Sequence, residues 1–260
     1  VSAVAVASAG AAPAGVGDMP RMTLDDLVGQ LSAIYADDLV AVALYGSAAR
    51  GEQATRHANL NVIVVVRRIT MDHLRKEAPV ARAWREAGHP PPLTMTRAEW
   101  LGGADIFPME YADILAHHRV LAGTLPLEGV SVDLADLRLQ LEHEAMSKLL
   151  RLRHAVLDVA GDSKALLSLL EDSVSTMLVL MRSALRLMGE SPPADSDAMC
   201  ERFTARSGRD AGVVRRALRH ARGVEAIDRR VADGVVEEYL NFAEHFVAFV
   251  DAWSQTHPTL

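Results

Sequence analysis

A glycine and a serine follow directly on a hydrophobic run, and their types suit the binding of a phosphate group. The run is Leu39–Tyr45, the pair is Gly46 and Ser47, and Arg50 comes three residues later. Glycine lets a phosphate approach the backbone, and a serine hydroxyl with nearby N–H groups can hold phosphate oxygens. Arg50 is a candidate phosphate partner or a solvated surface residue. The sequence therefore predicts a phosphate-binding turn, with a purely structural turn as the alternative.

Two asparagines, Asn59 and Asn61, mark the start of a second hydrophobic run, Leu60–Val66. Side chains two positions apart on a strand project from the same face. Aspartates in these positions would hold Mg²⁺ beside nucleotide phosphates for two-metal phosphoryl chemistry. An asparagine carbonyl can ligate Mg²⁺ but brings no charge. We therefore expect either two acceptors on one strand face beside the Gly-Ser turn, or polar turn and edge residues without a ligand.

The elements that must position these residues follow from the hydrophobic pattern. Both runs are short, rich in Val, Leu and Ile, and bounded by Gly or polar residues, which predicts buried strands. A helix capped by Thr23 should precede them, and a helix over Met71–Ala87 should follow, kinked or divided at Pro79. Four more elements are expected in this part of the chain: strands at Leu93–Met95 and Arg119–Ala122, and helices from Arg97 and from Pro108.

From Asp133 onward the pattern is that of helices alone. Long helices are expected from Asp133 to Gly161, from a cap at Ser163 to Gly189, and over Ile227–Trp253, with shorter ones at Ser196–Ala205 and Ala211–Arg222. The helix that follows Ser163 is apolar nearly all the way round, so it should be the central helix of a bundle. The predicted fold class is an α/β domain with a small mixed sheet and helices, followed by an all-α helical bundle domain.

The predicted domain limits are 1–22 for a disordered leader, 23–130 for the α/β domain and 131–260 for the bundle. The first eighteen residues contain no Lys or Arg, so they lack the basic region of a secretory signal. No apolar run approaches the roughly 20 residues needed to span a bilayer. The single cysteine, Cys200, excludes an intramolecular disulfide and fits a reducing compartment, so we expect a cytoplasmic protein.

The net charge of the chain is -7, which gives no whole-chain reason to bind nucleic acid or an anionic membrane. The expected partner is a nucleotide or another small-molecule ligand. A homodimer or a protein partner for the apolar bundle stays open as well.

The segment LYGSAARGE, followed by a turn and ANLNVIVVV, resembles the DNA polymerase β-type nucleotidyltransferase superfamily. The signature of that superfamily is a Gly-Ser motif followed by Asp-x-Asp on the next strand. A small catalytic domain followed by a helical domain is also similar to the kanamycin and streptomycin nucleotidyltransferases and to bacterial minimal nucleotidyltransferases. The resemblance implies a nucleoside triphosphate ligand at Gly46, Ser47 and Arg50, and it places the two metal-binding acids on Asn59 and Asn61.

The resemblance also implies a third acid near Leu93–Thr96, where the chain carries Thr94 and Thr96. Without these carboxylates, the first expectation is a nucleotide-binding or regulatory pseudoenzyme that has no assigned catalytic residue and little hold on Mg²⁺. The second is an active nucleotidyltransferase that transfers a nucleoside monophosphate to a small hydroxylated molecule or a protein. Its acids would come from elsewhere in the chain, such as Glu52, Glu99 or Asp105. The third is an interaction module with a vestigial cleft.

Other polar groups have two interpretations each. Glu110, Asp113 and His117 have the spacing of one helix face, which would suit a metal or simply solvent. Arg215 and His220 have the spacing of a ribonuclease motif found beside some minimal nucleotidyltransferases, or form part of a solvated helix. The first long helix of the bundle carries basic residues that either face a cleft or pair with carboxylates of their own helix: Arg138, Lys148, Arg151 and Arg153.

Overall fold

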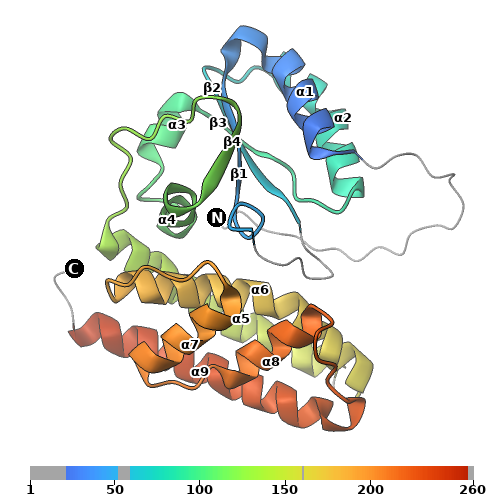
Figure 1. The fold of residues 1–260 in the computed structure, drawn as a ribbon, viewed down its shortest axis with the longest axis vertical. Helices are drawn as coiled ribbons and strands as arrows, with labels where there is room; N and C mark the ends of the chain where they lie inside the picture. The colour runs from blue at the N-terminus through green and yellow to red at the C-terminus, as the bar shows by residue number, and fades with distance from the viewer. Residues whose placement is uncertain (1–21, 52–58, 160, 257–260) are drawn as a thin grey trace, which may run out of the picture. The chain divides into compact units, whose positions relative to one another are not determined.

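The computed structural model describes residues 22–51, 59–159 and 161–256. These residues form two compact units, coloured along the chain in Figure 1. The first contains residues 22–45, 59–100 and 119–126, and the second contains residues 46–51, 101–118, 127–159 and 161–256. The expected fold class, a mixed sheet with helices followed by a helical bundle, is confirmed. The domain limits at 23–130 and 131–260 stay a prediction, and residues 1–21 of the expected leader lie outside the described residues.

The first unit is built on a four-stranded sheet with the order β3-β2-β1-β4. Strand β2 is antiparallel to β1 and parallel to β3, so the sheet is mixed. Five consecutive residues at the end of β2 are buried, as expected for a central strand that is covered on both faces. The strand limits are β1 Leu39–Tyr45, β2 Asn61–Val66, β3 Leu93–Thr96 and β4 His118–Gly123.

Helices α1 (Leu24–Tyr35) and α2 (Met71–Glu86) lie side by side in Figure 1. Helix α1 begins at the expected Thr23, whose hydroxyl accepts a hydrogen bond from the backbone N–H of Asp26 in a capping box. Helix α2 continues through Pro79, so the expected division does not occur, and the alternative of a kink at Pro79 stays a prediction. Because the residues that follow Pro79 pack into the core, tertiary burial offsets the hydrogen bond that proline removes.

The second unit is a helical bundle with α6 (Ser163–Leu187) at its centre, as the sequence predicts. Helix α6 makes its most extensive contacts with four other helices of the bundle. Its N-cap is Asp162, which accepts hydrogen bonds from the N–H groups of Lys164 and Ala165, so the expected cap at Ser163 is wrong by one residue. The other helices of this unit are α4 Pro108–Ala116, α5 Leu134–Val159, α7 Ser196–Ser207, α8 Gly212–Ala221 and α9 Ala232–Thr256.

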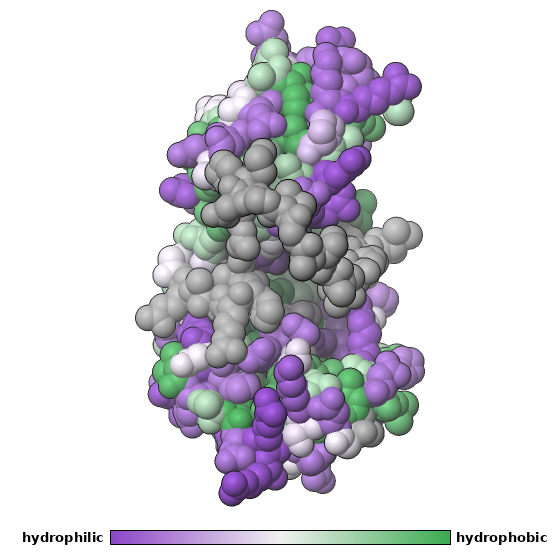
Figure 2. Space-filling view, turned by 90° about the vertical axis from the view of Figure 1, so that its right-hand side faces the viewer, coloured by the Kyte–Doolittle hydropathy of each residue, from purple (hydrophilic) through white to green (hydrophobic). Residues whose placement is uncertain are grey.

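Three short elements complete the described chain: the helix α3 Arg97–Gly102 and the 3-10 turns η1 Ala36–Asp38 and η2 Arg229–Val231. None of the helices within the described ranges has the length and apolar character needed to cross a membrane. On the face shown in Figure 2, hydrophilic residues predominate and hydrophobic residues are scattered among them.

Candidate functional site

Gly46 ends the first strand and opens a tight turn. Its φ of 78° lies in the left-handed region, which glycine adopts at little cost. The carbonyl oxygen of Gly46 accepts hydrogen bonds from the N–H groups of Ala49 at 3.1 Å and Arg50 at 3.2 Å. Gly46 is buried and Ser47 is half-buried. The backbone geometry of the turn therefore favours glycine here, whether or not the turn binds a phosphate.

The two asparagines differ in their structural setting. Strand β2 begins at Asn61, which is half-buried and has Tyr45 of β1 as its register partner. Asn59 precedes the strand and is exposed. Because Tyr45 directly precedes Gly46 in the chain, the Gly-Ser turn follows the end of β1, and Asn61 stands at the start of the antiparallel strand beside it.

The sheet face that carries Asn61 has no carboxylate among the described residues of β1, β2 and β3. Register partners in neighbouring strands project to the same face, and residues two apart share it. Because Ile63 pairs with Leu93, the β3 side chains on this face are those of Leu93 and Met95. The remaining strand side chains on this face are apolar or aromatic: Ala41, Ala43, Tyr45, Ile63 and Val65. The threonines that the sequence offered in place of a third acid therefore belong to the opposite face.

On that opposite face, Thr94 takes part in a buried network. Its hydroxyl donates to Glu77 of α2 at 2.9 Å, and the hydroxyl of Tyr35 donates to the other carboxylate oxygen of Glu77. Burial, and then the hydrogen bond to Glu77, raise the pKa of Tyr35 well above its ordinary value. Glu77 is not part of any motif in the sequence. Its helical spacing with buried Val80 and Trp84 is a signal that it faces the core.

In the second unit, Asp113 of α4 joins two arginines from distant parts of the chain. One terminal nitrogen of Arg50 lies 2.6 and 2.9 Å from the two carboxylate oxygens, and Arg186 of α6 lies 3.0 Å from one of them. The exposed fractions of the side chains are 6% for Arg50, 17% for Asp113 and 13% for Arg186, so the cluster is largely desolvated. Arg50 and Asp113 are candidates from the sequence as members of separate motifs, whereas Arg186, a basic residue in the last turn of α6, belongs to no motif in the sequence.

His117, at the C-cap of α4, belongs to the same neighbourhood. Its Nδ1 atom is buried and has no hydrogen-bond partner within the described part of the chain. Burial lowers the pKa of this imidazole. Asp113 opposes that effect, and Arg50, Arg186 and Arg182 add to it. The neutral imidazole is therefore favoured, and it carries one N–H donor.

These contacts do not favour the metal interpretation of Glu110, Asp113 and His117. Asp113 faces arginines, and Glu110 accepts a hydrogen bond from the amide of Gln140 at 2.9 Å. No group of three or more His, Cys, Asp or Glu residues that could hold a metal ion is present in the described ranges.

The acids considered for an active enzyme have separate positions. Glu99 accepts a hydrogen bond from the backbone N–H of Thr96 at 2.7 Å at the start of α3, and Asp105 is exposed in the loop before α4. Glu52 lies outside the described residues.

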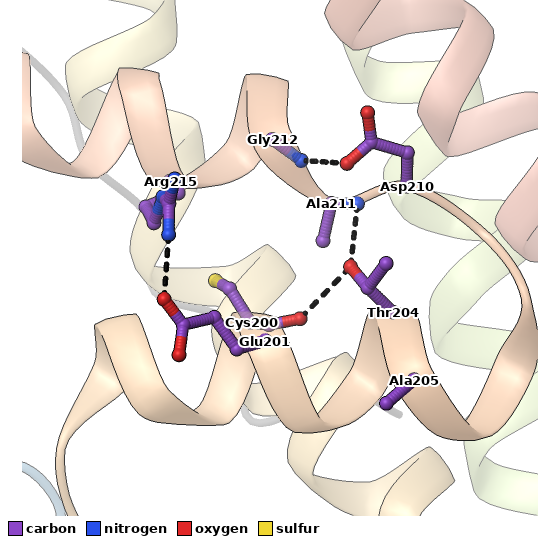
Figure 3. A pocket seen from close by; sticks show the side chains of 8 residues that line it. All are labelled: Cys200, Glu201, Thr204, Ala205, Asp210, Ala211, Gly212 and Arg215. Atoms are coloured by element: carbon purple, nitrogen blue, oxygen red, sulfur yellow. Dashed lines mark hydrogen bonds and ion pairs between the residues drawn. The ribbon is translucent and has the colours of Figure 1, made fainter.

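A pocket of about 270 Å³ lies between α7 and α8 (Figure 3). Its polar lining groups contact one another. Asp210 accepts from Gly212 N–H at 2.8 Å, Thr204 accepts from Ala211 N–H at 3.0 Å, and Arg215 donates to Glu201 at 2.7 Å. Cys200 and Ala205 complete the lining. These contacts stabilise the junction of the two helices and do not by themselves indicate a ligand.

The ribonuclease interpretation of Arg215 and His220 receives no support, because the two side chains contact different partners. Arg215 pairs with Glu201, whereas Nδ1 of His220 accepts from the backbone N–H of Ile227 at 3.2 Å. Three of the basic residues of α5 likewise pair within the bundle. Arg138 lies 3.4 Å from Glu142, Arg151 lies 4.0 Å from Glu144, and Arg153 lies 2.8 Å from Glu244 of α9.

No model of a protein family matches this chain, and no curated protein matches it either. What the structure shares with the expected superfamily is coarse: a small mixed four-stranded sheet with helices, followed by a helical region.

Proposed function

We propose that this protein is a nucleotide-binding pseudoenzyme of the nucleotidyltransferase type, with a degenerate metal site. One observation carries the proposal. A Gly-Ser turn follows β1, Asn61 begins the antiparallel strand β2, and the sheet face of Asn61 has no carboxylate among the described strand residues. The turn suits phosphate binding, and the face does not suit the binding of Mg²⁺.

Metal-dependent catalysis is disfavoured because negatively charged ligands for Mg²⁺ are absent from the described strand residues on this sheet face. Mg²⁺ gives up its water reluctantly and is usually bound through carboxylates together with substrate phosphates. Asn59 and Asn61 supply neutral carbonyls only, and Leu93 and Met95 supply none on the neighbouring strand. Two-metal phosphoryl transfer needs both ions to stabilise the attacking and the leaving oxygen. The proposed role is therefore to bind a nucleoside triphosphate without transferring its nucleotide.

Calorimetric titration with ATP and GTP tests the binding site. We expect Arg50→Gln and Ser47→Ala to weaken binding, the first by about tenfold, because a charge-assisted contact to phosphate is lost. Arg67→Gln and Ser168→Ala change the same residue types at exposed positions and should leave the affinity unchanged. Absence of heat with any nucleoside triphosphate would overturn the proposal.

A radiolabel experiment tests the missing catalysis. The protein is incubated with Mg²⁺ and ATP or GTP labelled on the α-phosphate, together with a panel of small hydroxylated acceptors. We expect no labelled product and no labelled protein. Transfer of the label to an acceptor, or to the protein itself, would establish the active nucleotidyltransferase instead.

A further inference from the structure

We propose that Arg50, Arg186 and His117 form a binding site for a phosphate oxyanion, and that Asp113 competes with this oxyanion for the two arginines. The inference deepens the proposed function and rests on it for the identity of the ligand, a nucleoside triphosphate. It assigns the groups that would hold the phosphates, and it assigns Asp113 the role of an internal competitor.

The geometry of the cluster already shows oxyanion recognition. Two guanidinium groups, one from the turn after β1 and one from α6, donate to a single carboxylate at 2.6 to 3.0 Å. Guanidinium groups recognise carboxylate and phosphate with the same planar arrangement of donors. A phosphate group offers more acceptor oxygens and more charge than the carboxylate of Asp113, so it can engage both arginines more strongly.

Charge favours an added anion in this neighbourhood. Three arginines and one aspartate act on His117, so positive charges outnumber negative ones among these four neighbours. Because Arg50 and Arg186 are largely desolvated, an oxyanion beside them meets cations that water screens poorly.

His117 supplies a further group for the anion. It follows Asp113 by four residues, so both stand on one side of the end of α4. Its buried Nδ1 atom lacks a hydrogen-bond partner among the described residues, which is costly for a polar atom that is removed from water. With its proton on Nδ1, the neutral imidazole would donate one hydrogen bond to the oxyanion.

Titration of the full chain with tripolyphosphate, ATP and adenosine tests the inference, and the three probes separate the phosphate chain from the nucleoside. We expect Asp113→Asn to tighten tripolyphosphate binding by about tenfold, because the negative charge that competes with the oxyanion is removed. Arg186→Gln should weaken the binding by a similar factor. Asp72→Asn and Arg153→Gln are the controls, because they remove the same charges from exposed ion pairs. Both should leave the affinity for tripolyphosphate and the affinity for ATP unchanged. Thermal unfolding of each variant identifies those that do not fold.

The outcomes separate the two proposals. If the folded Asp113→Asn variant binds tripolyphosphate no more tightly than the wild type, or if Arg186→Gln binds it equally well, the oxyanion site is overturned even where ATP binds. If tripolyphosphate responds to both variants as expected but ATP binds no better than tripolyphosphate, the oxyanion site holds and the nucleotide-binding function fails.

Discussion

Gly123, at the end of β4, is in a position that only glycine can occupy without a rearrangement. Its φ is +68°, and a Cβ atom built there would lie 2.0 Å from the carbonyl oxygen of Val40 in β1. The next residue, Thr124, donates its N–H to the same carbonyl at 2.9 Å. Close approach of the two backbones therefore depends on the absent side chain.

Gly123→Ala should lower the free energy of unfolding by about 3 kcal/mol or more, because it combines a left-handed backbone with a backbone clash. Gly129→Ala is the matched control, since Gly129 also has a positive φ, of +78°, but has open space around the position of a Cβ. The control should cost only about 1–2 kcal/mol. Urea denaturation of both variants measures the difference, and equal losses would contradict the close approach.

Lys148 of α5 is a half-buried cation whose charge opposes folding near neutral pH. Burial, and then the charge of Arg151, lower its pKa from 10.5 to about 8, while Asp172 opposes the shift. Between pH 8 and 10.5 the unfolded chain holds a proton that the folded chain has released, so the stability contribution of Lys148 rises with pH across this window. Below pH 8 both states are protonated, and the folded state bears the cost of the buried charge.

Lys148→Met should therefore raise the free energy of unfolding at pH 7 by about 1–3 kcal/mol, because a methionine of similar length carries no charge to desolvate. The gain should shrink as the pH approaches 10.5, the ordinary pKa of lysine. Denaturation curves of both proteins at pH 7 and pH 10 provide the comparison. A gain that is the same at both pH values would show that packing and not charge accounts for the effect.

At the scale of the elements, helices α7 and α8 enclose the single cysteine. Burial is the main cause that raises the pKa of the Cys200 thiol to about 12, and Asp197 adds to it. A thiol that is both buried and protonated is a poor nucleophile. The pocket beside it therefore does not make Cys200 a reactive site.

Cys200 should resist an aromatic disulfide reagent at pH 8 in the folded protein and react fully once the protein is unfolded in guanidinium. The absorbance of the released thiolate measures both rates. Rapid reaction of the folded protein would mean that α7 and α8 separate readily, in contradiction to their packing here.

Element limits follow largely from local signals, and the sequence therefore predicts them well. The first strand is confirmed as Leu39–Tyr45, and the Thr23 cap is confirmed with its capping box. A cap at Ser163 is expected because Asp162 and Ser163 are adjacent and both residue types can act as an N-cap. In the structure Asp162 is the N-cap of α6. The helix through Pro79 is continuous because tertiary packing, which local sequence does not encode, offsets the cost of proline.

Only part of the candidate site can be predicted from the sequence. The Gly46 turn and the asparagines are visible as a motif, because they are close in sequence. Strand register decides which β3 side chains share the face of Asn61. The packing of α4 and α6 brings Arg186 to Asp113, which also contacts Arg50. Neither has a sequence signal.

At the scale of the whole molecule, the residues of the proposed function belong to two compact units. The first carries the sheet with Asn61 and its face without carboxylates, and the second carries the Gly46 turn and the arginine cluster. The proposal rests on groups of a type that can hold phosphates, and the described residues include no group of three or more His, Cys, Asp or Glu side chains that could hold a metal ion. Nucleotide binding that does not need Mg²⁺ is therefore the central claim.

The measurement that tests this claim most directly is the affinity of the wild-type chain for ATP in excess Mg²⁺ and in excess EDTA. We expect binding in both conditions with affinities within about threefold, since the described strand residues on the face of Asn61 include no carboxylate that could recruit the ion. Binding that is lost in EDTA would show a working metal site, and absence of binding in both conditions would show that the turn holds no nucleotide. Either result would contradict the account.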